Sequence, residues 1–301
     1  MRRKAEFLLF LTTFVWASTF VSNKIVLMEV SPFLLTTVRF ALATAIAFAV
    51  SYRHILALDR DALKKGTILG LLLSIGFIIQ TFGLQQTSAS KSAFITGMLV
   101  VFTPIAQVVI ERRAPKLGNV VGIVFVSVGL WFLTSPAGSA FNTGDGLTLI
   151  AAVLFALYIV YLDVFTKELP HEGGVAQLFF LQLMVTLLVA LIGTVLFENF
   201  SFHPTRNALL LIIYLSIFAT VISTFIQTKY QRETTPTRAA LIFSIEPVIA
   251  ALLAYLVLDE RIGLLGIIGG ALIVAGVLIS EFSDSFKKIA VQIGVRPEEV
   301  E

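Results

Sequence analysis

Apolar residues run along this chain in long continuous stretches rather than at alternate positions. We count ten such stretches, each near the roughly 20 residues that a helix needs to cross a bilayer core. They are Phe7–Leu27, Pro32–Val50, Gly66–Gln86, Ser92–Ile110, Leu117–Leu133, Leu147–Phe165, Val175–Phe197, Ala208–Thr228, Ala239–Leu258 and Leu264–Ile279. Their continuity argues against a membrane β-barrel, whose strands alternate apolar and polar residues. We therefore predict an all-α membrane protein with ten transmembrane helices.

The composition agrees with this prediction and narrows the classes of function. Charged residues make up only 14% of the 301 positions, against about 25% in soluble domains, which excludes an ordinary soluble enzyme. The chain has no cysteine, so disulfides, thiolate metal sites and cysteine nucleophiles are excluded. The three histidines, His54, His171 and His203, fall in separate predicted loops. We expect neither a metal site nor a cofactor.

Lysine and arginine residues lie mostly on one side of the predicted membrane. Ten spans place both termini on the same side, and nearly all of the basic residues fall on that side. The exceptions are Lys91, Arg206 and Arg261 on the opposite side, and Lys24 and Arg39 inside spans. Since basic residues favour the cytoplasmic side, we expect a multi-pass protein of the cytoplasmic (inner) membrane with both termini in the cytoplasm.

Short sequence patterns recur along the chain at a nearly constant distance. Ser74, Thr81 and Gln85 recur as Ser216, Ser223 and Gln227, each 142 residues later, while Thr81-Phe82 also matches Thr224-Phe225 with a slip of one residue. Pro104 recurs as Pro247, and Gly122 and Gly129 recur as Gly269 and Gly276. The recurrences predict two related halves of the chain.

The two predicted halves are residues 1–136 and 144–280, followed by a polar cytoplasmic tail at residues 281–301. Each half contains five spans, and five is odd, so the second half is expected to cross the membrane in the opposite sense. Inverted repeats of this kind are typical of secondary transporters, whose substrate site lies between the repeats near the middle of the bilayer.

Several motifs resemble the EamA-type branch of the drug/metabolite transporter superfamily. They are Trp16-Ala17-Ser18-Thr19-Phe20, Ser31-Pro32 followed by Arg39-Phe40, Phe243–Val248, Leu258–Arg261 and the glycine-rich run Gly266–Gly276. The resemblance covers nearly the whole chain and implies a ten-helix exporter of amino acids or related metabolites. The chain departs from an even repeat in one place: Pro104 precedes Gly129 by 25 residues, whereas Pro247 precedes Gly276 by 29.

Polar side chains form stripes on four of the predicted helices. From these stripes and the neighbouring aromatic residues we select substrate-binding candidates: Trp16, Thr19, Asn23, Ser74, Thr81, Gln85, Tyr158, Ser223 and Gln227. Polar groups in hydrocarbon must pair or face water, so the stripes indicate a polar pathway. The alternative is that they form hydrogen bonds between packed helices. The repeat predicts that Gln85 and Gln227 face each other across one cavity.

Glu246 is the candidate coupling residue, because it is a carboxyl group near the middle of a span. Pro247 directly follows it, and proline removes a backbone hydrogen bond, so Pro104 and Pro247 are both predicted to kink their helices. Glu246 would take part in proton coupling or bind a substrate amine. The alternative is an acid that braces its helix against a neighbour.

Two cations inside spans have structural and functional interpretations. Arg39 could bind a substrate carboxylate or phosphate, or it could pair with Glu29 or reach the membrane surface. Lys24 lies one turn from the end of its span, where we expect its amine to reach the surface.

Taken together, these features predict a secondary transporter that exports a small metabolite, amino acid or drug-like compound. A passive channel or lipid scramblase on the same bundle is the alternative. We expect no enzyme, since no catalytic pair or nucleotide-binding loop is present. The expected partners are a small-molecule substrate and the lipid bilayer, with no nucleic acid, and the expected state is a monomer or weak homodimer.

Overall fold

A computed structural model describes residues 2–58, 60–134, 141–169, 172–198, 201–261 and 263–292 of the chain. Its helices are α1 (Arg2–Val26), α2 (Pro32–Ile55), α3 (Arg60–Gln86), α4 (Ala89–Gly97), α5 (Leu99–Glu111), α6 (Leu117–Thr134), α7 (Thr143–Lys167), α8 (Glu172–Phe197), α9 (Arg206–Tyr214), the π-helix η1 (Leu215–Ile222), α10 (Ser223–Tyr230), the 3₁₀-helix η2 (Gln231–Glu233), α11 (Pro236–Phe243), α12 (Glu246–Leu258) and α13 (Leu264–Gln292). No strand occurs in these ranges.

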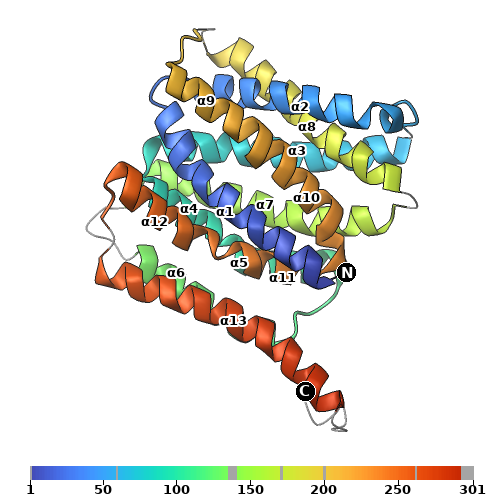
Figure 1. The fold of residues 1–301 in the computed structure, drawn as a ribbon, viewed down its shortest axis with the longest axis vertical. Coiled ribbons are helices and arrows are strands. Elements are labelled where there is room, and N and C mark those ends of the chain that lie inside the picture. The colour runs from blue at the N-terminus through green and yellow to red at the C-terminus, as the bar shows by residue number, and fades with distance from the viewer. Residues whose placement is uncertain are drawn as a thin grey trace.

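The helices fall into ten apolar segments, in the order that the sequence predicts. Eight segments are long and apolar enough to cross a membrane, and the segments Leu117–Phe132 and Leu264–Ser280 are shorter apolar helices. The segments run side by side, with α6 and α13 along one edge of the bundle (Figure 1). The predicted all-α, multi-pass membrane architecture is therefore confirmed. The predicted tail begins inside α13, and residues 293–301 lie outside the described residues.

Three of the ten segments are interrupted within their length. One of them is broken at Met98, between α4 and α5. A second is broken at Ser244 and Ile245, between α11 and α12. Pro247 follows its break directly, as expected for a residue that cannot donate the helical hydrogen bond. Pro104 instead lies inside α5, six residues after the break at Met98. The third interrupted segment passes from α9 through η1 to α10.

The π-helix η1 coincides with the slip in the internal repeat. Ser216 matches Ser74 at a distance of 142 residues, whereas Thr224 matches Thr81 at 143, so one extra residue lies between these two positions. A π-turn accommodates one extra residue in a helix. The hydroxyl groups follow the wider turn, because Thr220 Oγ1 donates to Leu215 O and Ser223 Oγ to Phe218 O, five residues back.

Glycines bring α6 and α13 into close contact. A Cβ atom on Gly122 would lie 2.7 Å from Gly276 O, and one on Gly129 would lie 2.6 Å from Gly269 O. The lower-numbered glycine of α6 thus faces the higher-numbered glycine of α13, so the two helices run antiparallel. Contacts of this kind let helix backbones approach closely in a membrane. By contrast, Gly270 meets only Val248, at 3.5 Å.

Charged side chains cap helices at the end of the bundle where α1 finishes. Lys24 Nζ donates to Leu84 O at 2.8 Å and to Thr87 O at 2.6 Å, at the carboxyl end of α3. A cation at this place satisfies carbonyl groups that have no partner within the helix. Lys24, which the sequence predicts to reach the membrane surface, is therefore held against the end of α3.

Two glutamates at the same end cap helix amino termini. Glu198 accepts from the backbone nitrogens of Phe33 at 3.0 Å and Leu34 at 2.9 Å, in the first turn of α2. Glu260, just beyond α12, accepts from Ala89 N at 2.9 Å and from Ser90 in the first turn of α4. Carboxylates at these positions satisfy free backbone donors and complement the helix dipole, and they tie together segments that are distant in sequence.

Candidate functional site

A cavity lies near the middle of the bundle, where the interrupted segments meet α1, α3 and α7. Its lining comprises Trp16, Thr19, Phe20, Leu73, Phe77, Gln80, Thr96, Leu99, Phe155, Tyr158, Ile159, Thr224, Gln227, Phe243 and Glu246. Water can occupy about 80 Å³ of this space, where one molecule needs roughly 10–15 Å³ by a similar measure. The cavity therefore has room for several waters or part of a small ligand. We call it the central cavity.

Among the described residues that line the central cavity, Glu246 is the single charged one. It is the first residue of α12, and 8% of its surface is exposed. Within the described residues, no side chain or backbone group donates a hydrogen bond to its carboxylate. Its position at a helix amino terminus favours a negative charge there. The break between α11 and α12 thus places an uncompensated acid inside the bundle.

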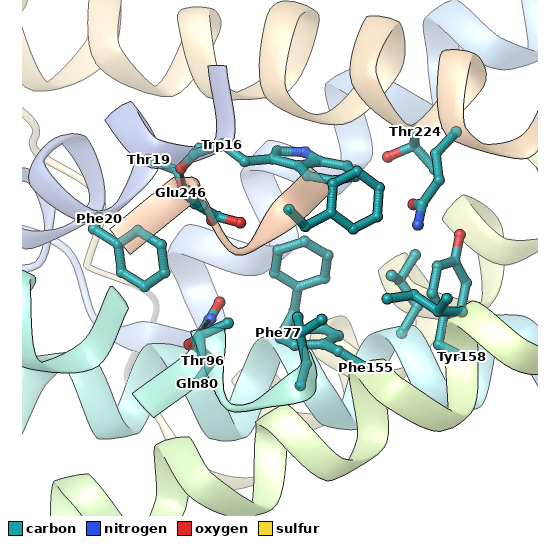
Figure 2. A pocket seen from close by; sticks show the side chains of 15 residues that line it. Trp16, Thr19, Phe20, Phe77, Gln80, Thr96, Phe155, Tyr158, Thr224 and Glu246 are labelled. Atoms are coloured by element: carbon teal, nitrogen blue, oxygen red, sulfur yellow. Dashed lines mark hydrogen bonds between the residues drawn. The ribbon is translucent and has the colours of Figure 1, made fainter. Parts of the chain in front are cut away.

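Aromatic rings form much of the remaining wall. Trp16 packs edge-to-face against Phe243 with ring centroids 5.1 Å apart, and Phe77 packs in the same way against Phe155 at 5.4 Å. Figure 2 shows Glu246 beside Thr19 on one side of the cavity, Tyr158 and Thr224 on the other, and the ring of Phe77 between them. The wall therefore suits a flat, apolar ligand.

Several hydrogen-bond donors in the lining already have protein acceptors. Trp16 Nε1 donates to Ala219 O at 3.0 Å, and Tyr158 Oη donates to Gln182 Oε1 at 2.7 Å. Thr19 Oγ1 donates to the carbonyl of Trp16 at 2.7 Å. These three side chains therefore present rings and methyl groups to the cavity more than polar hydrogens.

Two glutamines of the lining belong to short hydrogen-bond chains. Gln80 Nε2 donates to Thr96 Oγ1 at 2.8 Å, which joins α3 to α4. Gln227 Nε2 donates to Gln231 Oε1 at 2.9 Å, and Gln231 in turn donates to Ile159 O at 2.7 Å. Each glutamine is held in place on one side and borders the cavity on the other.

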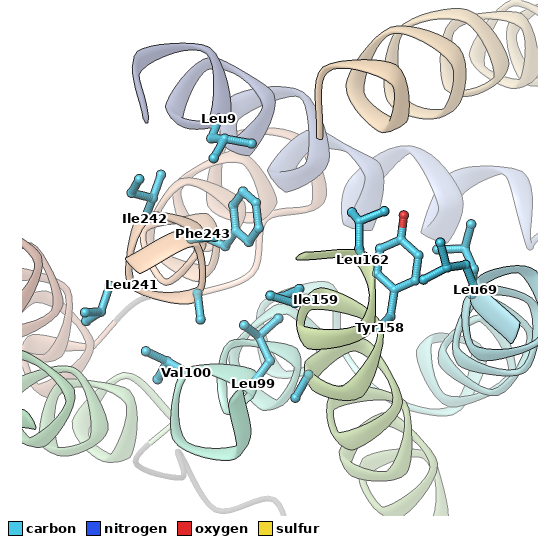
Figure 3. Close-up of a cluster of buried hydrophobic side chains, with 14 of the residues drawn as sticks. Leu9, Leu69, Leu99, Val100, Tyr158, Ile159, Leu162, Leu241, Ile242 and Phe243 are labelled. Carbon is cyan, nitrogen blue, oxygen red and sulfur yellow. The ribbon is translucent and has the colours of Figure 1, made fainter. Parts of the chain in front are cut away.

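The central cavity continues directly into the apolar core of the bundle. Leu99, Tyr158, Ile159 and Phe243 belong both to the lining and to the largest buried cluster (Figure 3). Substitutions at these four positions would therefore change packing together with ligand contacts, whereas Glu246 and the glutamines are not part of the cluster.

The structure brings together five of the residues predicted to bind substrate or to couple transport. Trp16, Thr19, Tyr158, Gln227 and Glu246 all line the central cavity. They come from α1, α7, α10 and α12.

Five other predicted residues do not line the cavity. Ser74 and Thr81 donate to carbonyl groups of their own helix, Ser223 does the same, and Asn23 is buried. Gln85 is exposed at the end of α3. The structure therefore does not place Gln85 and Gln227 across one cavity.

The face of α3 explains this difference. Its lining residues are Leu73, Phe77 and Gln80, whereas the polar stripe of Ser74, Thr81 and Gln85 lies about 100° around the helix. Serine and threonine hydroxyls can satisfy themselves on carbonyl groups of the preceding turn, so a polar stripe need not face water.

Other lining residues escaped the sequence analysis. Thr224 was detectable, because the slip in the repeat matches it to Thr81. Phe77, Phe155 and Phe243 have no distinguishing signal in a chain with 26 phenylalanines. Gln80 lies outside the stripe that drew attention to its helix.

Arg39 lies behind the cavity wall and does not pair with Glu29. Its Nε donates to Thr220 Oγ1 at 2.7 Å, and its guanidinium lies 5.0 Å from the ring centroid of Phe77. The carboxylate of Glu29 instead accepts from the backbone nitrogen of Thr205 at 2.7 Å. Arg39 therefore connects α2 to η1, and of the alternatives considered for it, the pairing with Glu29 does not form.

Polar clusters join segments near both ends of the bundle. Where α1 begins, Glu6 Oε1 accepts from Arg238 Nε at 2.9 Å, and Gln107 accepts from Thr237 Oγ1 at 2.6 Å. At the opposite end, Asp145 pairs with Lys91 at 2.6 Å. Each cluster joins segments from both parts of the chain.

Comparisons with known proteins agree with this architecture. The pattern of the EamA-like transporter family matches residues 3–135 and again residues 142–282. An uncharacterized transporter of Archaeoglobus fulgidus is 30% identical over 92% of this chain and 86% of its own length. A probable amino-acid metabolite efflux pump of Escherichia coli is 25% identical over 98% of this chain and its full length. A solved crystal structure has the same fold, with a TM-score of 0.74, 18% identity, and coverage of 93% of this chain and 97% of the other.

Proposed function

This chain belongs to the EamA-like transporter family, and from that premise we propose that it is a secondary transporter working by alternating access. Its substrate is a small metabolite, amino acid or drug-like compound, exported across the cytoplasmic membrane, with both termini in the cytoplasm. The relative named as an amino-acid metabolite efflux pump supports the direction and the size of the substrate.

The observation that carries the proposal is the central cavity. It lies within a bundle of ten apolar segments, contains an unpaired acid, and is lined by residues of both matched parts of the chain. A site of this kind, with broken helices at its edge, fits a carrier whose substrate binds near the middle of the bilayer.

An inverted repeat is part of the proposal, and the contact between α6 and α13 supports it. Gly122 and Gly129 correspond to Gly269 and Gly276 in the internal repeat, yet Gly122 faces Gly276 and Gly129 faces Gly269. Two copies of one helix that meet in this crossed manner are related by a two-fold rotation that reverses their direction. Residues 1–136 and 144–280 are the proposed halves.

We assign separate roles to the predicted residues. Trp16 and Tyr158 form the apolar wall, Thr19 and Gln227 add polar contacts, and Glu246 couples transport to a change of charge in the cavity. The residues outside the cavity, namely Asn23, Ser74, Thr81, Gln85 and Ser223, hold helices together.

Counterflow in proteoliposomes tests the proposal. Vesicles loaded with an unlabelled amino acid or aromatic amine should transiently accumulate the same labelled compound, and the initial rate should saturate. Glu246→Gln should abolish the dependence of this rate on an imposed pH gradient, whereas Glu168→Gln, which removes a carboxylate outside the cavity, should preserve it. Flux that rises linearly with concentration for every compound would indicate a channel instead.

A further inference from the structure

We propose that the ligand of the central cavity is an organic cation: an amine or quaternary ammonium group attached to a flat apolar body. This inference rests on the proposed transport function and names the chemical class of its substrate. It follows from three properties of the cavity wall.

The first property is the sign of the charge. In the part of the chain that the structure describes, Glu246 is the single carboxylic acid in the lining, and no lysine, arginine or histidine lines the cavity. Its carboxylate accepts no hydrogen bond from the described residues, although only 8% of the surface of this residue is exposed. A buried carboxylate is costly unless a cation or hydrogen-bond donor accompanies it, so a positively charged ligand would supply what the protein does not.

The second property is the way in which the lining donors are used. Trp16, Thr19 and Tyr158 each direct a polar hydrogen to another protein group. An anionic ligand would need such hydrogens to replace its hydration shell. These three side chains therefore offer an anion no free hydrogen, whereas an ammonium group brings its own donors or needs none.

The third property is the aromatic wall. The rings of Trp16, Phe77 and Phe243 line the cavity, and the negative face of an aromatic ring attracts a cation within about 6 Å. The same rings provide an apolar surface for the body of the ligand. Arg39 lies over Phe77 from outside the cavity, at 5.0 Å from the ring centroid, which leaves Trp16 and Phe243 as the two of these three rings without a neighbouring protein cation in the described part of the chain.

The chain contains a natural reporter for the test. It has two tryptophans, Trp16 in the cavity and Trp131, which is 74% exposed on α6. In a Trp131→Phe background, the fluorescence of Trp16 reports binding at the central cavity. Three probes of similar shape and different charge are then titrated in detergent: 2-phenylethylamine, 2-phenylethanol and 3-phenylpropionate.

We expect 2-phenylethylamine to bind at least about tenfold more tightly than the neutral alcohol, and 3-phenylpropionate to bind most weakly. Glu246→Gln should remove the preference for the amine while leaving the affinity for the alcohol within about twofold. Glu246→Asp should retain part of the preference, and Glu168→Gln should retain all of it. Equal affinity for amine and alcohol, tighter binding of the propionate, a preference that survives Glu246→Gln, or no saturable response to the amine would each overturn the inference.

Counterflow of the same three probes separates this inference from the transport proposal. Counterflow of the alcohol or the propionate without a preference for the amine would overturn the cationic ligand and leave the carrier intact. Amine-selective binding without counterflow of any probe would support the ligand class and count against the carrier.

Discussion

The two matched parts of the chain differ where α3 corresponds to the segment from α9 to α10. The segment α3 is a regular helix of 27 residues, whereas its counterpart contains a π-helix of eight residues. Both border the central cavity, α3 with Phe77 and Gln80 and the other with Thr224 and Gln227. One extra residue therefore changes which side chains of a repeated sequence reach the cavity. The repeat therefore preserves where this helix lies in the bundle, but not which of its faces turns toward the cavity.

The contact between α6 and α13 is the opposite case. There the repeated glycines meet in crossed pairs, Gly122 with Gly276 and Gly129 with Gly269, so that both parts of the chain contribute the same groups to one interface. The bundle combines a symmetrical contact at its edge with unequal walls around its cavity. Three changes test this contrast, and we give them from the largest expected effect to the smallest.

Deleting Ile217 should have the largest effect on transport. The deletion removes the extra residue of η1, and restoring a regular α-helix would rotate one part of the segment by about 100° relative to the other. Thr224 and Gln227 would then leave the cavity, and we expect counterflow to fall by more than about tenfold, which corresponds to roughly 1.4 kcal/mol or more in the rate-limiting barrier.

Ile217→Ala is the matched control for this deletion, because it changes the side chain and keeps the chain length. It should retain counterflow within about threefold, with both variants eluting as folded protein on gel filtration. If the deletion variant transports as well as the control, the π-helix does not determine the lining of the cavity.

Gly276→Ala should destabilise the protein without altering the residues of the cavity. Its Cβ atom would meet Gly122 O at 2.7 Å, and forcing apart a close-packed contact costs about 1–3 kcal/mol. Gly122→Ala should have nearly the same effect, since the contact is reciprocal. The measurement is thermal unfolding in detergent followed by tryptophan fluorescence.

Gly270→Ala on the same helix provides the comparison, because its Cβ atom would make only ordinary contacts. Alanine is the better helix former by up to about 1 kcal/mol, so this variant should be as stable as the wild type or slightly more so. Equal unfolding temperatures for Gly276→Ala and Gly270→Ala would contradict the close approach of α6 and α13.

The smallest difference is expected between two glutamines of α3. Gln80→Ala removes a side chain that lines the cavity and its hydrogen bond to Thr96. Loss of one hydrogen bond between Gln80 and a bound ligand would cost about 0.5–1.5 kcal/mol, so the affinity for a transported ligand should fall by roughly two- to twelvefold. Gln85→Ala changes an exposed residue and should alter the affinity by less than about twofold. If Gln85→Ala lowered the affinity more than Gln80→Ala, the polar stripe of α3 would be the face that lines the cavity.

The sequence predicts the number and order of the apolar segments because the thickness of a bilayer imposes their length. It also identifies Trp16, Thr19 and Glu246, which lie on the cavity side of their helices. In each of these cases a polar or amphipathic residue stands in an apolar run.

The sequence does not predict which face of α3 lines the cavity, because polar side chains of this helix form hydrogen bonds within the helix rather than with water. The hydroxyl groups of Ser74 and Thr81 bond to their own helix, so their stripe marks no cavity. Phe77 and Phe155 line the cavity with side chains that would suit lipid equally well. The rotation of α3 depends on how it packs against other helices, and the spacing of residues along one chain does not contain that information.

The carboxylate of Glu260 links the far end of α12 mechanically to α4. This helix has 13 residues, a rod of about 20 Å, with Glu246 at one tip and Glu260 just past the other. Glu260 accepts hydrogen bonds from the first turn of α4. A tilt of α12 on ligand binding at Glu246 would therefore displace α4 as well. Ligand binding in the cavity would then change the position of a helix end near the membrane surface through the rigid body of α12 alone.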